Sequence, residues 1–233
     1  MLLPLLPILP LIVVIVLLIH AETRPPRNKQ QAKLWRLLAT VLVILVAALS
    51  LTQPTHLLLY SVLILAGLLL SLLGEWWFIE ADEQPGRFLS GLYAFLFAHL
   101  AYILAFAYAQ LMRSAPLDFN RAGLAAGILL LLGSVIYYYL RPSLGELRQP
   151  VLLCITVMSL TVHQAVSGVQ LGSSLLTQPA LAVGGAVLFY VSAFFLAINK
   201  FVFDGEGEGN SVWALSTYYG AQLLIALSAS FVR

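Results

Sequence analysis

Eight long apolar runs, separated by short polar breaks, constrain this sequence more than any other feature. The runs cover approximately residues 2–19, 35–51, 56–78, 88–112, 122–140, 149–168, 179–201 and 212–231. Each has roughly the 20 apolar residues that an α-helix needs to cross the hydrocarbon core of a bilayer. None alternates polar and apolar residues as the strands of a membrane β-barrel do. The sequence therefore predicts an all-α polytopic membrane protein in which one domain, residues 1–233, forms a bundle of about eight transmembrane helices.

The composition agrees with a lipid environment and argues against several other classes of protein. Of the 233 residues, 61% are hydrophobic and 9% are charged, whereas a soluble domain has roughly a quarter of its residues charged. The net charge of +2 gives no indication of nucleic-acid binding. No metal-ligand spacing, phosphate loop or CxxC pair occurs in the sequence, so we expect no metal or organic cofactor. Cys154, the single cysteine, lies inside an apolar run, and we interpret it as a small buried residue.

We interpret the first apolar run as a retained membrane span rather than a cleaved signal peptide. No basic residue precedes it, and it is long for the apolar core of a signal peptide. The later breaks are short and contain helix-ending pairs such as Gln53-Pro54 and Arg141-Pro142. Such short connections favour antiparallel neighbours with no separate soluble domain.

The basic residues predict which side of the membrane each loop faces. If the loop after the first span is cytoplasmic, nine basic residues lie on that side: Arg24, Arg27, Lys29, Lys33, Arg36, Arg87, Arg141, Arg148 and Lys200. Three lie on the other side: Arg113, Arg121 and Arg233. Because cytoplasmic loops are enriched in lysine and arginine, we expect both termini on the non-cytoplasmic side. The membrane would be the plasma or inner membrane if the source is bacterial.

A few ionisable side chains lie within the apolar runs, where they are costly and therefore candidates for function. Glu75 lies near the cytoplasmic end of its run and His99 near the middle of another, while His163 lies well inside a third. Structural roles remain open for each. Glu75 has the position of an interfacial carboxylate beside Trp76 and Trp77, and a neutral histidine can connect two helices. For His163 we favour the structural role.

Helical spacing groups several polar residues on common faces. Steps of three and four connect one stripe: Phe88, Gly91, Phe95, His99, Tyr102 and Phe106. Two other pairs also share faces, Ser192 with Asn199 and Tyr218 with Gln222. If these faces point inward, one cavity is lined by Glu75, His99, Tyr102, Ser192, Asn199, Tyr218 and Gln222. The periodicity leaves open whether they converge, since Gln222 also suits a link between helices and Lys200 suits an anchor at the interface.

Four motifs in order resemble the YhhN-like lysoplasmalogenase family over roughly residues 35–231. They are Gly74-Glu75, the stripe from Phe88 to Phe106, the segment from Gly185 to Ser192 that runs on to Asn199-Lys200-Phe201, and Thr217-Tyr218-Tyr219-Gly220-Ala221-Gln222. Members of that family have about eight spans. The resemblance implies hydrolysis of the vinyl ether bond of lysoplasmalogens, which yields a fatty aldehyde and a glycerophospho-ethanolamine or -choline. The partners implied are thus a lysophospholipid substrate and the lipid bilayer, with no oligomeric state indicated.

The resemblance also implies roles for individual residues. The family pattern has an aspartate after the glycine of the third span and another after the serine of the seventh, where this chain has Glu75 and Ala193. Vinyl ether hydrolysis begins with proton transfer to carbon, which a carboxylic acid can perform. Glu75 is then the general acid, and His99 or Tyr102 positions water or the hemiacetal oxygen. The remaining residues of the predicted cavity would contact polar parts of the substrate: Ser192, Asn199, Tyr218 and Gln222. This chemistry requires no cofactor.

Two other functions remain open from the sequence. A non-catalytic lipid-binding or lipid-handling protein on the same scaffold would need only the cavity, and Ala193 at an acidic position of the family pattern favours it. A small transporter is disfavoured because the sequence shows no clear inverted repeat or paired broken helices.

Overall fold

The described part of the chain folds into eight α-helices and contains no strand. The computed structural model describes residues 3–23, 29–52, 57–81, 84, 86–113, 118–170, 176–203 and 208–232. The helices are α1 (Ile8–Thr23), α2 (Lys29–Ser50), α3 (Leu58–Glu80), α4 (Gly86–Met112), α5 (Phe119–Leu140), α6 (Arg148–Ser167), α7 (Thr177–Phe201) and α8 (Glu208–Ser228). Three short 3-10 turns accompany them: η1 (Leu3–Leu5), η2 (Arg141–Ser143) and η3 (Gly145–Leu147). The all-α prediction is confirmed.

Helix ends differ from the apolar runs where local sequence extends a helix beyond the hydrocarbon. α2 begins at Lys29, six residues before its predicted start at 35, because the polar stretch Lys29–Lys33 consists largely of strong helix formers. α5 begins at Phe119 because Asp118 caps it, with its side chain accepting a hydrogen bond of 3.1 Å from the amide of Arg121.

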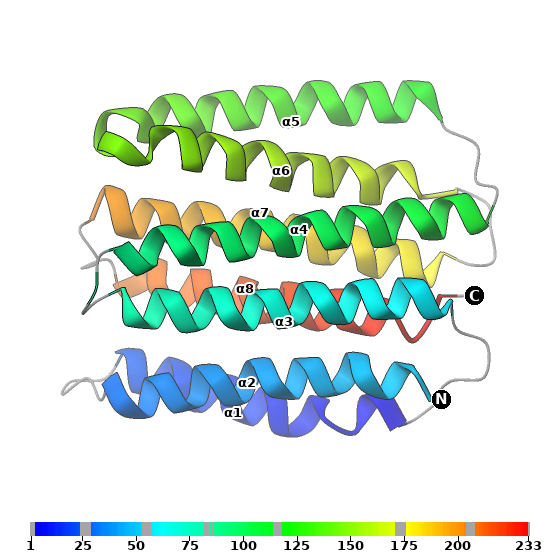
Figure 1. Ribbon diagram of the computed structural model, residues 1–233, viewed down its shortest axis with the longest axis horizontal. Helices are drawn as coiled ribbons and strands as arrows, with labels where there is room; N and C mark the ends of the chain where they lie inside the picture. The colour runs from blue at the N-terminus through cyan, green and yellow to red at the C-terminus, as the bar shows by residue number, and fades with distance from the viewer. Residues whose placement is uncertain are drawn as a thin grey trace.

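The helices run side by side along the long axis of the molecule, and both ends of the described chain lie at the same end of the bundle (Figure 1). An even number of antiparallel helices produces this arrangement. α1, α3, α5 and α7 finish at the opposite end of the bundle, and most of the basic residues of the described chain lie near that end (Figure 1). The protein is an integral, multi-pass membrane protein, while the side that each end faces remains a prediction.

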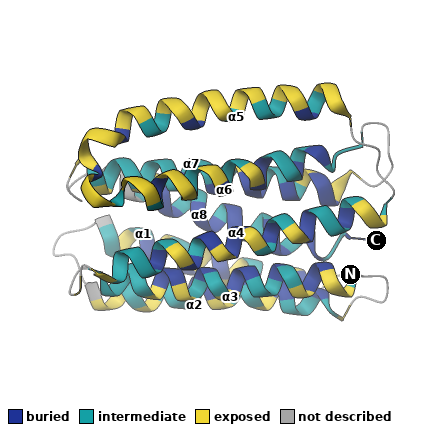
Figure 2. Cartoon of the chain, turned by 45° about the horizontal axis from the view of Figure 1, so that its top comes forward, coloured by how far each residue is buried: buried dark blue, intermediate teal, exposed yellow. Residues whose placement is uncertain are grey.

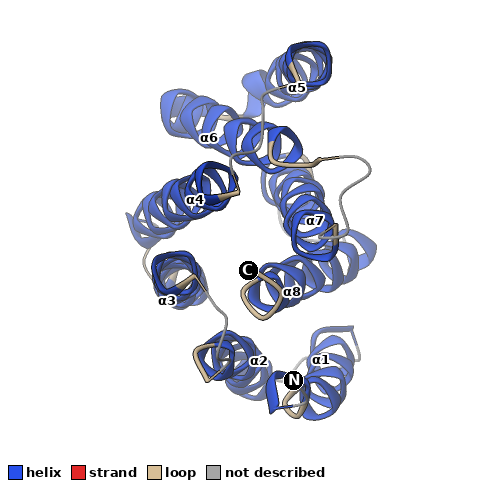
Figure 3. Cartoon of the chain, turned by 90° about the vertical axis from the view of Figure 1, so that its right-hand side faces the viewer, coloured by secondary structure: helices blue, strands red, loops and turns tan. Residues whose placement is uncertain are grey.

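Seven helices of the described chain are long and apolar enough to cross a membrane, and α8 is the exception. α8 lies inside the bundle between α3 and α7 (Figure 3) and also packs against α1 and α2. Its Tyr219, Gln222 and Ser228 have no exposed surface. A helix covered by protein need not be lipophilic, because its polar side chains meet other helices rather than lipid.

α5 lies at the outside of the bundle and is the most exposed helix in Figure 2. Only Ala122, Gly133 and Leu140 of α5 are buried. Its leucines are exposed because lipid tails are as apolar as they are, so exposure to the bilayer carries no hydrophobic cost.

Close packing between α3 and α4 sets the depth of the candidate site. A Cβ atom at Gly91 would lie 2.4 Å from the ring of Phe78 and 3.0 Å from the carbonyl oxygen of Gly74. A Cβ atom at Gly74 would in turn lie 2.8 Å from the ring of Phe95. Glycine at both positions lets the two backbones approach each other. The contact fixes an antiparallel register in which Gly74 and Gly91 lie at the same depth.

Candidate active site

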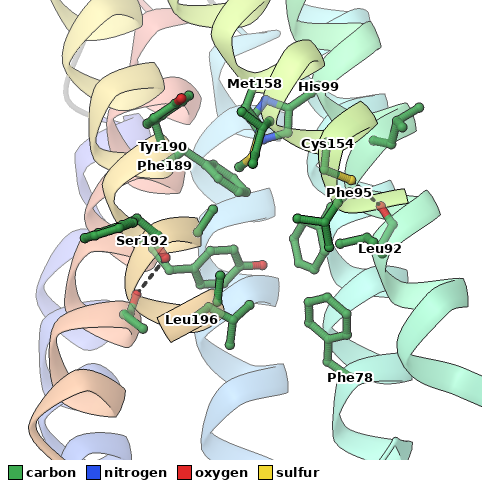
Figure 4. A pocket seen from close by; sticks show the side chains of 18 of the residues that line it. Phe78, Leu92, Phe95, His99, Cys154, Met158, Phe189, Tyr190, Ser192 and Leu196 are labelled. Atoms are coloured by element: carbon green, nitrogen blue, oxygen red, sulfur yellow. Dashed lines mark hydrogen bonds between the residues drawn. The ribbon is translucent and has the colours of Figure 1, made fainter. Parts of the chain in front are cut away.

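A cavity of about 160 Å³ is lined mainly by α3, α4, α6, α7 and α8, and α2 and α5 also contribute to its wall. Its walls are mostly apolar. Phe189, Ser192 and Leu196 of α7 lie on one side, opposite Phe95 and Phe78 (Figure 4). The polar side chains that line it include Arg36, Glu75, His99, Ser192 and Tyr218. An apolar chamber with a few polar groups suits a ligand with a hydrocarbon chain.

Glu75 is the carboxyl group of this cavity and is held from two other helices. Its side chain is 4% exposed. One oxygen accepts a hydrogen bond from the hydroxyl of Thr40 on α2, and the other accepts one from the hydroxyl of Tyr219 on α8. The Arg36 guanidinium also lines the cavity and interacts electrostatically with Glu75, but its hydrogen bonds go to Glu22, the shorter at 2.5 Å. Glu75 is therefore fixed by two hydroxyls rather than by a direct ion pair.

His99 also lines the cavity, and one of its ring nitrogens has no hydrogen-bond partner among the described residues. Its Nδ1 lies 3.1 Å from the hydroxyl oxygen of Thr161, and that hydroxyl lies 2.9 Å from the carbonyl oxygen of Val157. When the hydroxyl proton of Thr161 goes to Val157, Thr161 accepts from His99 and the ring proton is on Nδ1; when that hydroxyl donates to His99, Nδ1 is the acceptor. The Nε2 atom is buried and has no hydrogen-bond partner in the described part of the chain.

Glu75 and His99 line one cavity but lie at different depths. With Gly74 level with Gly91, nine residues of helix separate the backbones of Glu75 and His99 along the bundle axis, roughly 13 Å. Both side chains lean towards the N-terminal ends of their own antiparallel helices, and so towards each other. Aromatic rings lie between them, with Phe95 and Tyr218 5.9 Å apart between centroids. The carboxyl and the imidazole therefore lie at opposite ends of a shared stretch of the cavity wall.

The other predicted residues divide into two groups. Ser192 and Tyr218 line the cavity, whereas Tyr102, Asn199 and Gln222 do not. Ser192 donates a hydrogen bond of 2.8 Å to the carbonyl of Ala214 and so connects α7 to α8. The Tyr218 hydroxyl is buried and has no hydrogen-bond partner in the described chain.

Of the three residues outside the cavity wall, Tyr102 contacts a residue of the wall, while Gln222 and Asn199 differ in their burial. Tyr102 packs edge-on against His99, at 5.7 Å between centroids, and its hydroxyl lies 3.3 Å from that of Ser71. Gln222 is fully buried, and neither polar atom of its side chain has a partner among the described residues. Asn199 is half-buried near the end of α7.

Comparison with known proteins covers the helices that form this cavity. The model of the YhhN family matches residues 31–229, which include α3 to α8 and nearly all of α2. The chain belongs to the YhhN family. It is 35% identical over 169 residues to the lysoplasmalogenase TMEM86A of Bos taurus and 32% identical over 168 residues to that of Homo sapiens. In both comparisons the match covers 71% of this chain and 64% of the relative, so the chain spans somewhat less than two thirds of their length. No solved structure shows a significant match.

Within this YhhN-family site, the sequence analysis missed the two partners of Glu75. Thr40 is four residues after Arg36, so the two share one face of a largely apolar span. Tyr219 stands next to Tyr218 inside one of the family motifs. A buried carboxyl requires hydrogen-bond donors, and that requirement points to hydroxyls in neighbouring spans, although it does not select these two.

Proposed function

We propose that this YhhN-family protein hydrolyses the vinyl ether bond of lysoplasmalogens, releasing a fatty aldehyde and a glycerophospho-ethanolamine or -choline. The observation that carries the proposal is a single buried carboxyl, Glu75, in the wall of an apolar cavity. The names of the relatives, both lysoplasmalogenases, support it. Among the described residues, Glu75 is the only carboxyl that lines the cavity.

The order of groups along the cavity suits one orientation of the substrate. The amine of Lys200, the penultimate residue of α7, lies 5.6 Å from the centroid of Phe88, a residue of the cavity wall. Glu75 lies five residues before the end of α3 at the same end of the bundle, roughly 8 Å deeper. Five bonds separate the phosphorus from the vinyl ether oxygen of a lysoplasmalogen, about 6–7 Å when extended. A phosphate beside Lys200 therefore places the vinyl ether near Glu75 and the alkyl chain towards His99.

The first step transfers a proton from the Glu75 carboxyl to the outer carbon of the vinyl ether. The carbon–carbon double bond becomes a single bond, and the positive charge is shared between the inner carbon and the ether oxygen. Glu75 is then a carboxylate beside this oxocarbenium ion, which it stabilises electrostatically because few other polar groups compete in the cavity.

The second step adds water to the oxocarbenium carbon and returns the proton to Glu75. The product is a hemiacetal, which collapses when its hydroxyl loses a proton, the bond to the glycerol oxygen breaks and that oxygen takes up a proton. The Tyr218 hydroxyl can donate a hydrogen bond to the hemiacetal oxygen, and His99 Nε2 can hold a water molecule deeper in the cavity. Because Glu75 first gives and then regains the proton, the methyl group of Ala193 in the cavity wall is compatible with catalysis.

Hydrolysis in heavy water tests the function and the transfer of a solvent-derived proton to carbon. Purified protein in detergent is incubated with a lysoplasmalogen in D₂O, and the aldehyde is analysed by mass spectrometry. We expect one deuterium at the carbon next to the carbonyl, because that carbon receives the proton from the solvent-exchanged carboxyl. The same aldehyde incubated with the Glu75→Gln variant corrects for exchange after release.

The Glu75→Gln variant also separates catalysis from lipid binding. We expect it to release aldehyde roughly 10²–10⁴ times more slowly than the natural protein and to bind the lysoplasmalogen with similar affinity. If the natural protein binds the lipid and releases no aldehyde, the protein is a lipid-binding member of the family. Equal turnover by both proteins would remove Glu75 from the mechanism.

A further inference from the structure

Two hydroxyl groups beside Glu75 each lie within reach of a second acceptor. The Thr40 hydroxyl contacts one oxygen of Glu75 and lies 3.1 Å from the backbone carbonyl oxygen of Arg36. The Tyr219 hydroxyl contacts the other oxygen of Glu75 and lies 3.2 Å from the same carbonyl. Thr40, Tyr219, the Arg36 carbonyl and the Glu75 carboxyl therefore form one closed group of atoms, which we name the carboxyl ring.

A count of protons shows that the carboxyl ring has two complete arrangements. Each hydroxyl has one proton and can also accept, and a carbonyl oxygen has two lone pairs. When Glu75 is ionised, both hydroxyls donate to it. When Glu75 is protonated, it donates to one hydroxyl oxygen, and that hydroxyl turns its own proton to the Arg36 carbonyl. No heavy atom has to move between the two arrangements.

We propose that Thr40 and Tyr219 are positioning residues that let Glu75 alternate between its protonated and ionised forms during turnover. The proposal rests on the proposed function, in which Glu75 gives up a proton and regains it. A buried carboxyl surrounded only by donors favours the ionised form, and one surrounded only by acceptors favours the protonated form. Hydroxyls that can donate in either of two directions accommodate both.

In the described chain, the other polar groups near Glu75 form no hydrogen bond to its carboxyl, so only the two hydroxyls can adjust to its protonation state. The Arg36 guanidinium on α2 is hydrogen-bonded to Glu22, and the Tyr218 phenol on α8 has no hydrogen-bond partner in the described chain. α4 presents the apolar ring of Phe95 to Gly74, the neighbour of Glu75 on α3. In the described part of the chain, neither Arg36 nor Tyr218 is hydrogen-bonded to the Glu75 carboxyl, so neither can exchange a proton with it directly.

Kinetics of matched variants test the proposal. Thr40→Val keeps the shape of the side chain and removes the hydroxyl, while Thr40→Ser keeps the hydroxyl. We expect Thr40→Val and Tyr219→Phe to lower kcat roughly 10- to 100-fold with little change in KM, and Thr40→Ser to stay within about threefold of the natural protein. Tyr60→Phe is the control, because Tyr60 is also fully buried and its hydroxyl bonds to Ser228 at 2.7 Å and Gln178 at 2.6 Å, away from the cavity.

Infrared spectroscopy gives a readout that does not depend on turnover. The difference between the natural protein and Glu75→Gln isolates the carbonyl stretch of the protonated Glu75 carboxyl. We expect this band to move in Thr40→Val and Tyr219→Phe, because each variant removes one hydrogen-bond partner, and to stay unchanged in Tyr60→Phe.

The two measurements separate the failure of this proposal from the failure of the proposed function. Absence of aldehyde release from the natural protein would overturn the function, while movement of the infrared band would still show that the hydroxyls contact the carboxyl. Full kcat in Thr40→Val, or a kcat in Thr40→Ser as low as in Thr40→Val, would overturn the role of the hydroxyls. An unmoved band in both variants would overturn the carboxyl ring itself.

Discussion

At the scale of single residues, the site depends on a carboxyl that reaches across the bundle. Glu75 belongs to α3, and its carboxyl accepts hydrogen bonds from the hydroxyls of Thr40 on α2 and Tyr219 on α8, so three helices determine its position. The glutamate side chain is one methylene longer than the aspartate of the family pattern, and the extra length helps its carboxyl to reach these two hydroxyls. Ala193, at the second acidic position of that pattern, leaves only a methyl group in the opposite wall.

A substitution at Ala193 tests whether one carboxyl is enough. We expect Ala193→Asp to change kcat by less than about tenfold, or 1.4 kcal/mol in the barrier, because Glu75 completes both proton transfers. Ala193→Asn controls for the added volume and polarity. A much larger gain with aspartate alone would show that this chain lacks a second acid that the reaction needs.

Lys200 gives a prediction about the head group of the substrate. We expect Lys200→Ala to raise KM for a lysoplasmalogen by roughly 10-fold, since a hydrogen bond to a charged group contributes about 1.5–3 kcal/mol. The same variant should hydrolyse an alkenylglycerol without phosphate as well as the natural protein does. Lys33→Ala is the matched control, because Lys33 lies 4.9 Å from the ring centroid of Trp76, a residue outside the cavity wall. An equal KM rise with both substrates would assign Lys200 to anchoring in the interface.

At the scale of elements, the contact between α3 and α4 holds the two walls of the site in register. Gly74 and Gly91 are in contact, and rings of Phe78 and Phe95 cover them. α8 supplies Tyr218 and Tyr219 from inside the bundle, where its polar side chains avoid lipid. The polar groups of the site are therefore placed by helix packing rather than by any loop of the described chain.

Alanine substitutions measure this packing. We expect Gly91→Ala to destabilise the protein by about 1–3 kcal/mol, because its Cβ atom would lie 2.4 Å from Phe78. Gly127→Ala on α5 is the control, since nothing lies within 4 Å of its Cβ position, and we expect no loss of stability or a gain of up to about 1 kcal/mol. Thermal unfolding in detergent, followed by circular dichroism, compares the two. Equal melting temperatures would mean that α3 and α4 can move apart enough to accommodate the added methyl group at little cost in stability.

At the scale of the whole molecule, the basic end of the bundle is also the end nearer to the buried carboxyl of the cavity. The basic residues at this end, where α3 and α7 finish, include Arg87, Arg141, Arg148 and Lys200. This end is also the one nearer to Glu75. If this end is cytoplasmic, as the distribution of basic residues predicts, the phosphate of the proposed substrate lies in the cytoplasmic leaflet.

Cysteine labelling tests this orientation. In a Cys154→Ser background, Gln84→Cys places a thiol at the basic end and Thr52→Cys places one at the opposite end, both at exposed positions. We expect a membrane-impermeant maleimide to label Thr52→Cys in intact cells and Gln84→Cys only after the membrane is opened. The reverse pattern would invert the topology and place the end of the bundle nearer to Glu75 on the non-cytoplasmic side.

The sequence by itself determined the helices and the residues worth examining. Apolar length is a local property, so the runs predicted eight helices, and the cost of an ionisable group in lipid singled out Glu75 and His99. Helical periodicity placed Ser192 and Tyr218 on faces that do line the cavity.

Only the tertiary structure decided which helices those faces meet. Periodicity defines the face of a helix but not its neighbour, its depth or its rotation. Thus Thr40 and Tyr219 emerged as partners of Glu75, and Gln222 proved to lie outside the cavity wall. The separation in depth between Glu75 and His99 follows from the close approach of α3 and α4 at Gly74 and Gly91, a contact that depends on both helices at once.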